Sequence, residues 1–180
     1  ELRRELGLAP HTPLIVYVGS LGPQYRPAEM AQLLARMPDA HFLALTGSGE
    51  VMRAALASAG VTRFTVKRVE AHEVARFIRA ADAGLSFREP TLSMRGVCPL
   101  KVIEYLLSGV PVVTNRGVGD LDALGDAGFS LPDFSSASLD AAARAITQFG
   151  APHRIAARQL GLSHFSLEAA ARGYAGALKV

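Results

Sequence analysis

Short runs of apolar, largely β-branched residues alternate along this chain with longer stretches in which apolar residues recur three and four positions apart. The first pattern is typical of buried β-strands and the second of amphipathic helices. When a helix connects two neighbouring parallel strands the crossover is right-handed, and repeated crossovers build a parallel sheet with helices on both faces. The alternation therefore predicts an α/β fold, a Rossmann-like three-layer sandwich.

The predicted strands and helices together cover most of the chain. Strands are predicted over residues 12–18, 40–46, 62–67, 83–87, 110–114 and 128–131. The helices between them are predicted over 27–37, 50–59, 71–81, 99–108 and 119–125. Beyond residue 134 the apolar period is purely helical, which predicts C-terminal helices over 137–149, 152–160 and 167–178, packed on the sheet edge or on a partner. We expect residues 1–180 to form a single domain around a parallel six-stranded sheet.

Local signals for helix ends agree with this division. Pro27 stands where the first turn of a helix tolerates a missing N–H, and Gly60 and Gly109 each follow the end of a predicted helix. Ser135 or Ser136 is expected to cap the first C-terminal helix.

Composition excludes several classes of protein. The chain has 180 residues, of which 49% are hydrophobic and 19% charged, so it can bury one full-sized core. No apolar run approaches the roughly 20 residues of a membrane-spanning helix. The single cysteine, Cys98, cannot form an internal disulfide, which predicts a reducing compartment, the cytoplasm. No Cys/His cluster has metal-ligand spacing, so we expect no metal.

The net charge of +3 is spread along the chain and forms no dense basic stripe. We therefore expect a small anionic ligand and no nucleic acid. The chain begins with ELRRELGL, which has neither an initiating Met nor the apolar core of a signal peptide. We expect this start to be the cut end of a longer polypeptide.

Ligands of a doubly wound sheet bind beyond the carboxyl ends of the strands, so we expect the functional residues in the loops there. The loop that follows the first strand begins with Gly19 and Ser20 and leads into the helix at Pro27. Glycine lets the backbone approach a ligand, and a helix N-terminus offers unpaired N–H groups. The loop is equally consistent with a binding site for an anion or a sugar and with a tight turn that binds no ligand.

The loop at Gly47 resembles the start of a dinucleotide fingerprint, but Met52 stands where its third glycine would be. The loop also follows the second strand and not the first, so NAD is not predicted. No phosphate-binding GxxxxGK[ST] motif occurs in the chain.

The segment REPTLSMRGVCPLKVIE, from Arg88 to Glu104, is the most informative one. It leaves the fourth strand as a long basic loop and enters a helix at Pro99. Unpaired N–H groups near Leu100 and Lys101 would face the cleft. Arg88, Arg95 and Lys101 add positive charge around the same place, which predicts a diphosphate site.

Glu104 lies one turn into that helix, where its carboxylate can accept hydrogen bonds from both hydroxyls of a sugar diol. The alternative is that Glu104 merely complements the helix dipole. Cys98 is expected to be a small packing residue beside the diphosphate loop and not an activated thiol. We expect Asp120 and Asp122 to cap the short helix predicted over 119–125 and not to approach a donor sugar.

Three segments, VYVGSLG, PLKVIEYLLSGVPVV and NRGVGD, resemble the C-terminal donor-binding domain of group 1 glycosyltransferases, which have the GT-B architecture. The resemblance extends from about residue 12 to the closing HFSLEAAARGYAGAL. It implies that this chain is the C-terminal half of a two-domain enzyme that transfers a sugar with retention from a UDP- or GDP-sugar, without a metal. Its partner would be the N-terminal acceptor domain of the same polypeptide, through which a peripheral membrane association stays open. The isolated half is expected to be inactive.

The resemblance also assigns roles to residues. Members commonly carry two glutamates eight positions apart, and Glu104 matches the second, which binds the nucleotide ribose. The first position is Gly96, so the carboxylate that usually neighbours the transferred sugar is absent. The backbone of Leu100 and Lys101 falls where the family holds the diphosphate. The base is expected near Lys67, Arg68 and Val69.

Many members place an Arg and a Lys after the first strand, where this chain has Ser20 and Arg26. We therefore expect Arg88, Arg95 or Lys101 to supply the positive charge that stabilises the leaving diphosphate, with Arg88 and Lys101 as the catalytic residues.

Two other functions stay open at this point: a GT-B nucleotide-sugar epimerase, and a nucleotide-binding module that lost catalysis with the acidic residue at position 96. A regulatory receiver-like domain would need an acidic cluster at the strand ends, which the sequence lacks.

Overall fold

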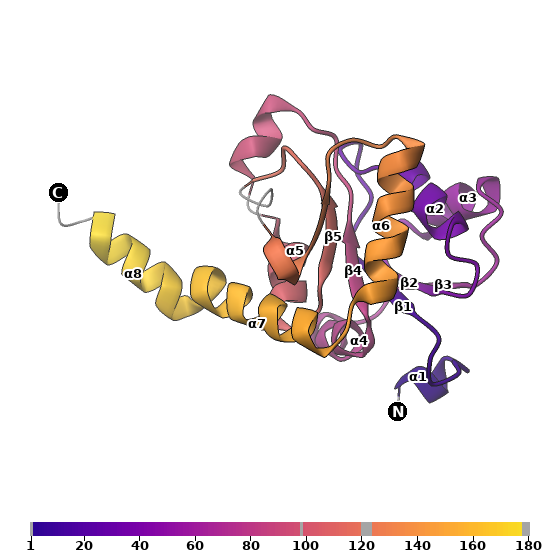
Figure 1. The fold of residues 1–180 in the computed structure, drawn as a ribbon, viewed down its shortest axis with the longest axis horizontal. Helices are drawn as coiled ribbons and strands as arrows, with labels where there is room; N and C mark the ends of the chain where they lie inside the picture. The colour runs from indigo at the N-terminus through magenta and orange to yellow at the C-terminus, as the bar shows by residue number, and fades with distance from the viewer. Residues whose placement is uncertain (1, 98, 120–123, 178–180) are drawn as a thin grey trace.

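A computed structural model of the 180-residue chain describes residues 2–97, 99–119 and 124–177. Its centre is a six-stranded sheet in the order β3-β2-β1-β4-β5-β6, in which every neighbouring pair is parallel (Figure 1). The strands are β1 (Leu14–Val18), β2 (His41–Leu45), β3 (Phe64–Lys67), β4 (Ala83–Ser86), β5 (Val112–Asn115) and β6 (Gly128–Leu131). The predicted fold class and all six predicted strands are confirmed.

The α-helices are α1 (Leu2–Glu5), α2 (Pro27–Ala35), α3 (Gly49–Ser58), α4 (Val74–Ala80), α5 (Leu100–Leu107), α6 (Ser136–Gln148), α7 (Ala151–Phe165) and α8 (Leu167–Ala177). Within the described ranges, three short 3-10 turns accompany them: η1 (Ala71–Glu73), η2 (Leu92–Gly96) and η4 (Gly125–Ala127). The helices predicted from residue 27 to residue 108 are confirmed to within two residues at each end, with η1 as the first turn of the third.

Two helices differ from the prediction. Helix α1 was not predicted because four residues are too few to show a helical period, and α7 continues five residues beyond its predicted end. The helix predicted over 119–125 falls mainly on residues 120–123, outside the described residues, as do Asp120, Asp122 and Cys98.

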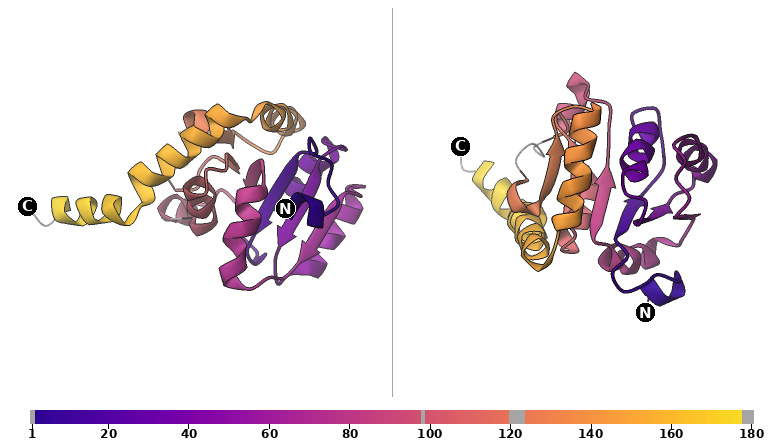
Figure 2. Two further views of the ribbon diagram at one scale, coloured as in Figure 1. Left: turned by 90° about the horizontal axis from the view of Figure 1, so that it is seen from below. Right: turned by 45° about the vertical axis from the view of Figure 1, so that its right-hand side comes forward.

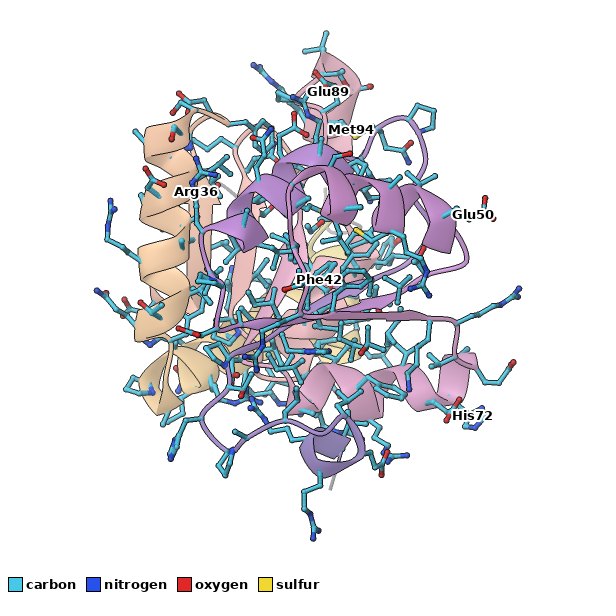
Figure 3. The ribbon with its side chains drawn as sticks, turned by 90° about the vertical axis from the view of Figure 1, so that its right-hand side faces the viewer. Arg36, Phe42, Glu50, His72, Glu89 and Met94 are labelled. Carbon is cyan, nitrogen blue, oxygen red and sulfur yellow. The ribbon has the colours of Figure 1, made fainter. Side chains whose placement is uncertain are left out.

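The helices cover both faces of the sheet, as Figure 2 shows. One core lies between the sheet and α2, α3 and α6, and the other lies between the sheet and α4, α5 and α7. Successive β1 side chains alternate between them, with Ile15 and Tyr17 in the first core and Leu14 and Val16 in the second. Phe42 stands in the middle of the first core (Figure 3). Burial on both faces explains why the strands are continuous apolar runs.

The helix ends follow the predicted chemistry. Pro27 occupies the first position of α2, and the hydroxyl of Ser135 caps α6 by accepting a hydrogen bond from the N–H of Ser138. Gly60 and Gly109 end α3 and α5 with φ angles of +72° and +66°, in the left-handed region that favours glycine.

The C-terminal helices differ in how they pack. Helix α6 packs on α2 and β6, and α7 packs closely on α5, where a Cβ at Gly161 would lie 2.8 Å from the backbone of Leu106. Helix α8 continues from α7 and extends away from the sheet (Figures 1 and 2). Its Leu167 and Tyr174 are exposed. No helix within the described ranges combines the length and apolar character needed to cross a membrane.

The sheet order fixes where a ligand can bind. Strands β1 and β4 are neighbours, and the chain winds outward from them in opposite directions. The loops that follow these two strands diverge, which leaves a crevice at their carboxyl ends. This switch point brings the loop from Gly19 and the loop from Arg88 face to face, and an isolated antiparallel bridge joins Tyr25 to Arg88.

Candidate functional site

Two adjoining hollows lie at the carboxyl end of the sheet. The larger has a volume of about 310 Å³ and is lined by six predicted site residues: Gly19, Ser20, Arg88, Leu100, Lys101 and Glu104. The smaller has a volume of about 210 Å³, shares Gly19 and Ser20 with the first, and adds Gly47, Arg68 and Val69. The fold therefore gathers nine of the predicted residues into one crevice, from segments up to 85 positions apart.

The two other predicted residues lie outside the linings of both hollows. Pro99 is the buried N-cap of α5, directly before two lining residues. Arg95 is exposed on η2. This turn rises beyond the carboxyl end of the sheet, where Figure 3 shows Glu89 and Met94 together. Gly96 ends the turn, and a Cβ placed on it would meet nothing within 4 Å. Because residue 96 is a glycine, this position of the chain carries no carboxylate.

Gly19 shapes the wall between the two hollows. Its φ of +112° is a conformation that other residues rarely adopt, and its N–H donates to the carbonyl of Leu45 at 2.9 Å. A Cβ at this position would lie 3.4 Å from the Nζ of Lys101. The glycine thus keeps the backbone after β1 within reach of a ligand and of the lysine.

Helix α5 forms the opposite wall and points its N-terminus at the larger hollow. Its Val102, Tyr105 and Leu106 are fully buried, which anchors the helix on the sheet. The N–H groups of Val102 and Ile103 donate to the carbonyl of Pro99, whereas those of Leu100 and Lys101 have no acceptor among the described residues, and Pro99 provides no side-chain cap. The helix dipole adds partial positive charge at the same end, which favours an anion.

Lys101 is 8% exposed, although it lines the larger hollow. Its Nζ donates a hydrogen bond of 2.8 Å to the hydroxyl of Tyr17. The same atom lies 4.0 Å from the ring centroids of both Tyr17 and Tyr25. Burial, followed by the nearby charge of Arg88, lowers the pKa of Lys101 to about 7. The amine therefore exchanges its proton near neutral pH.

Arg88 presents a positive charge that no described carboxylate offsets. Its Nη2 donates to the hydroxyl of Tyr25 at 3.0 Å, and its guanidinium stacks over that ring at 4.8 Å. The backbone N–H donates to the side chain of Asn115 on the neighbouring strand. Its Nε is buried and has no partner among the described residues. The side chain borders the larger hollow, where the charge of the guanidinium favours an anionic ligand.

Arg26 follows Tyr25 directly in the chain, but unlike Arg88 it is paired with carboxylates of the protein. It forms ion pairs with Glu29 and Glu89, and its guanidinium lies over the ring of Phe134 at 5.0 Å. The hydrogen bond to Glu29, then that to Glu89, raises the pKa of Arg26 further. Its charge is used within the protein, so Arg88 is the better-placed cation for a ligand.

Glu104 completes the larger hollow from the next turn of α5. Its side chain is exposed and forms no hydrogen bond or ion pair with any described residue. It also borders a hollow of about 220 Å³ between α4 and α5. The carboxylate is therefore available to a hydroxyl-bearing ligand.

Tyr17 and Tyr25 are two residues of the site that the sequence did not predict. Tyr17 lies in an otherwise aliphatic strand, and burial raises the pKa of its hydroxyl, so this group stays protonated. A lone hydroxyl near the carboxyl end of a central strand is the signal that could have identified it. Among the described residues, no group of three or more His, Cys, Asp or Glu side chains could hold a metal ion.

The sheet order, the two-sided helical cover and the crevice at the switch point define a Rossmann-like α/β domain. A family model described as "Glycosyl transferases group 1" matches residues 12–148, and the chain belongs to this family. No curated protein matches the sequence.

Solved structures share the fold. A sucrose-phosphate synthase from Thermosynechococcus elongatus is 20% identical with a TM-score of 0.72, and the match covers 98% of this chain and 47% of that one. HepE from Anabaena in complex with UDP is 18% identical with a TM-score of 0.73, covering 99% and 51%. A UDP-forming trehalose-phosphate synthase from Burkholderia xenovorans is 16% identical with a TM-score of 0.70, covering 99% and 46%. This chain spans about half the length of these GT-B structures.

Proposed function

We propose that this chain is the donor-binding half of a retaining glycosyltransferase and holds a UDP- or GDP-sugar in the crevice. The observation that carries the proposal is the combination of the unpaired N-terminus of α5 with the uncompensated guanidinium of Arg88 on one hollow. Both favour an anion, and both lie at the switch point where this class of sheet binds ligands.

The diphosphate is proposed to lie against the N–H groups of Leu100 and Lys101. Arg88 can contact it through its guanidinium, and Lys101 adds a further positive charge from the lining of the same hollow. Sugar transfer leaves a nucleoside diphosphate behind, so donors fixed around the diphosphate stabilise the transition state more than the ground state. Arg88 and Lys101 are therefore the proposed catalytic residues, acting through charge and without a metal.

The nucleoside is proposed to extend from the diphosphate along the crevice. The carboxylate of Glu104 can accept hydrogen bonds from the ribose diol. Gly47, Arg68 and Val69 line the smaller hollow, where backbone groups can contact the base. The relative from Anabaena is named as a complex with UDP, which supports UDP as the first donor to test.

The acceptor and the remaining catalytic groups are proposed to come from an N-terminal domain of the same polypeptide. This chain spans about half the length of its structural relatives. We expect the isolated half to bind the donor without transferring sugar, and any contact with a membrane surface to be made through the other domain.

A non-catalytic nucleotide-binding module is the second candidate, because Gly96 stands where the family resemblance implies a carboxylate. A GT-B epimerase has the same fold, and its product distinguishes it from a glycosyltransferase. Incubation of the chain, alone and with its N-terminal domain, with a bound nucleotide sugar distinguishes the three: an epimerised sugar, a transferred sugar or no reaction.

Titration calorimetry with UDP-glucose, GDP-mannose and ADP-glucose tests donor binding. We expect one nucleotide class to bind and the Arg88→Gln variant to bind it at least about tenfold more weakly, because a charge-assisted hydrogen bond is lost. Arg144→Gln is the matched control, since Arg144 is exposed on α6 and borders a different hollow. Equal affinity of the two variants would remove Arg88 from the site, and no binding by any donor would remove the proposed function.

A further inference from the structure

The amine of Lys101 is surrounded by charged and titratable groups from several elements. Tyr17 faces it from β1, Tyr25 from the loop before α2, and Arg88 from the loop after β4. Glu104 faces it from its own helix, one turn further on. The amine thus lies in a closed cluster, yet it also borders the hollow proposed for the diphosphate.

These neighbours act on the amine in opposite directions. Burial removes water from the ammonium, and the permanently charged guanidinium of Arg88 repels it. The carboxylate of Glu104, the hydroxyl of Tyr17 and the faces of two aromatic rings favour the ammonium. Burial and the repulsion by Arg88 outweigh the favourable contacts and bring the pKa of the amine near neutral pH, so a new charge beside the cluster is able to change its protonation.

A bound nucleotide sugar would bring such a charge. Each phosphate of its diphosphate has one ester bond and shares the anhydride bond, so each keeps one strongly acidic group; the diphosphate carries two negative charges and does not titrate near neutral pH. Placed between Arg88 and the N-terminus of α5, these charges would offset the repulsion from Arg88 and pair with the ammonium. In the complex, Lys101 would therefore hold a proton that it lacks in a fraction of the ligand-free molecules.

Resting on the proposed function, we infer that Tyr17 and Tyr25 are positioning residues that hold Lys101 at the diphosphate subsite, and that Lys101 takes up one proton from solvent when the donor binds. No covalent bond changes other than the new N–H bond. The amine becomes an ammonium, and its positive charge remains within the complex.

The inference predicts a defined pH dependence of donor binding. Below about pH 6 the ammonium is already present and proton uptake approaches zero, whereas at about pH 8.5 uptake approaches one proton per donor. Above about pH 7 the affinity falls by up to about tenfold per pH unit, until Lys101 in the complex also loses its proton. A site with a permanently charged lysine would show neither effect.

Titration calorimetry in buffers of different ionisation enthalpy measures the uptake directly. UDP-glucose and GDP-mannose are the probes, because their diphosphates do not titrate over this range. We expect the Lys101→Met variant to bind without proton uptake at every pH. Tyr174→Phe is the matched control, since Tyr174 is exposed on α8 and should leave the uptake of the wild-type chain unchanged.

The Tyr17→Phe variant separates positioning from mere structural support. It keeps the ring and removes the hydroxyl that accepts from Lys101, so the ammonium is less favoured in the free chain. We expect severalfold weaker binding at about pH 7.5 and affinity within about twofold of wild type at about pH 5.5. Tyr25→Leu keeps an apolar cover and removes the aromatic face, so it should shift the profile in the same direction. An equal loss at both pH values would make these tyrosines structural only.

A second measurement reads the amine without any ligand. The chain has three lysines, Lys67, Lys101 and Lys179, so carbon NMR of labelled lysine gives three Cε signals, and Lys101→Met assigns the one of interest. We expect that signal to titrate with a midpoint of about 7 in the free chain. A midpoint above about 9, or donor binding without uptake, would overturn the inference and leave the proposed function standing. If neither nucleotide sugar binds, both fail.

Discussion

The hydroxyl of Tyr105 accepts a hydrogen bond of 2.9 Å from the backbone N–H of Val18. Tyr105 is fully buried in α5, and Val18 is the last residue of β1, directly before Gly19. The bond therefore joins the helix that forms one wall of the crevice to the loop that forms the other. Burial raises the pKa of Tyr105, so the hydroxyl keeps its proton throughout the physiological range.

Replacing Tyr105 by Phe removes this bond and leaves the part-buried N–H of Val18 without this acceptor. We expect the free energy of unfolding to fall by about 1–3 kcal/mol in urea denaturation. Tyr174→Phe, at an exposed position on α8, should stay within about 0.5 kcal/mol of wild type. Equal stability of the two variants would show that the hydroxyl does not join the walls.

Gly84 in β4 allows Tyr105 to lie against the sheet. A Cβ at this position would stand 2.3–2.8 Å from three carbons of the Tyr105 ring. We therefore expect Gly84→Ala to lower the unfolding free energy by about 1–3 kcal/mol, since the ring must shift. Gly96→Ala is the control because its added Cβ meets nothing within 4 Å. A thermal unfolding temperature of Gly84→Ala at or above that of the control would contradict this packing.

Glu104 is proposed to bind the ribose diol, and a ligand lacking one hydroxyl tests this directly. Glu104→Gln should weaken binding of the ribonucleotide donor by about tenfold or more. The same substitution should have a clearly smaller effect on the 2′-deoxy donor, because the contact is already missing. Glu168→Gln, at the exposed start of α8, is the control. If the ribose and deoxyribose donors lose affinity equally, Glu104 acts only on the helix dipole.

The buried lysine makes a prediction about stability that needs no ligand. Its pKa is about 7 in the folded chain and near 10.4 when unfolded, so the unfolded state binds more protons between these values. The cost of burying the charged amine is therefore full below about pH 7 and falls as pH rises. We expect Lys101→Met to be more stable than wild type at about pH 6, with an advantage that shrinks by at most about 1.4 kcal/mol per pH unit above pH 7. An advantage independent of pH from about 6 to 9.5 would contradict the lowered pKa.

The strands could be predicted because they are buried on both faces and stand out as continuous apolar runs. The same reasoning identified the crevice, since a doubly wound sheet places its loops at one edge. It brought Gly19, Arg88 and Glu104 to that edge without knowledge of any contact. Sequence patterns of this kind therefore predict which loops form the site.

Pairings within the region could not be predicted. Lys101 and Tyr17 are 84 positions apart, and their contact depends on how α5 packs beside β1. Arg26 and Arg88 are equivalent cations in the sequence, yet Arg26 is paired with two carboxylates and Arg88 with none among the described residues. Such differences arise from tertiary packing, which leaves no local periodic signal.

The central claim is that the N-terminus of α5 holds the diphosphate of a nucleotide sugar. Titration of the 15N-labelled chain with UDP-glucose or GDP-mannose tests it most directly, because each backbone N–H reports its own environment. We expect the amide signals of Leu100 and Lys101 to shift most, together with that of Gly19 across the crevice. Saturable binding that leaves these amides unmoved, or no binding by either donor, would contradict the claim.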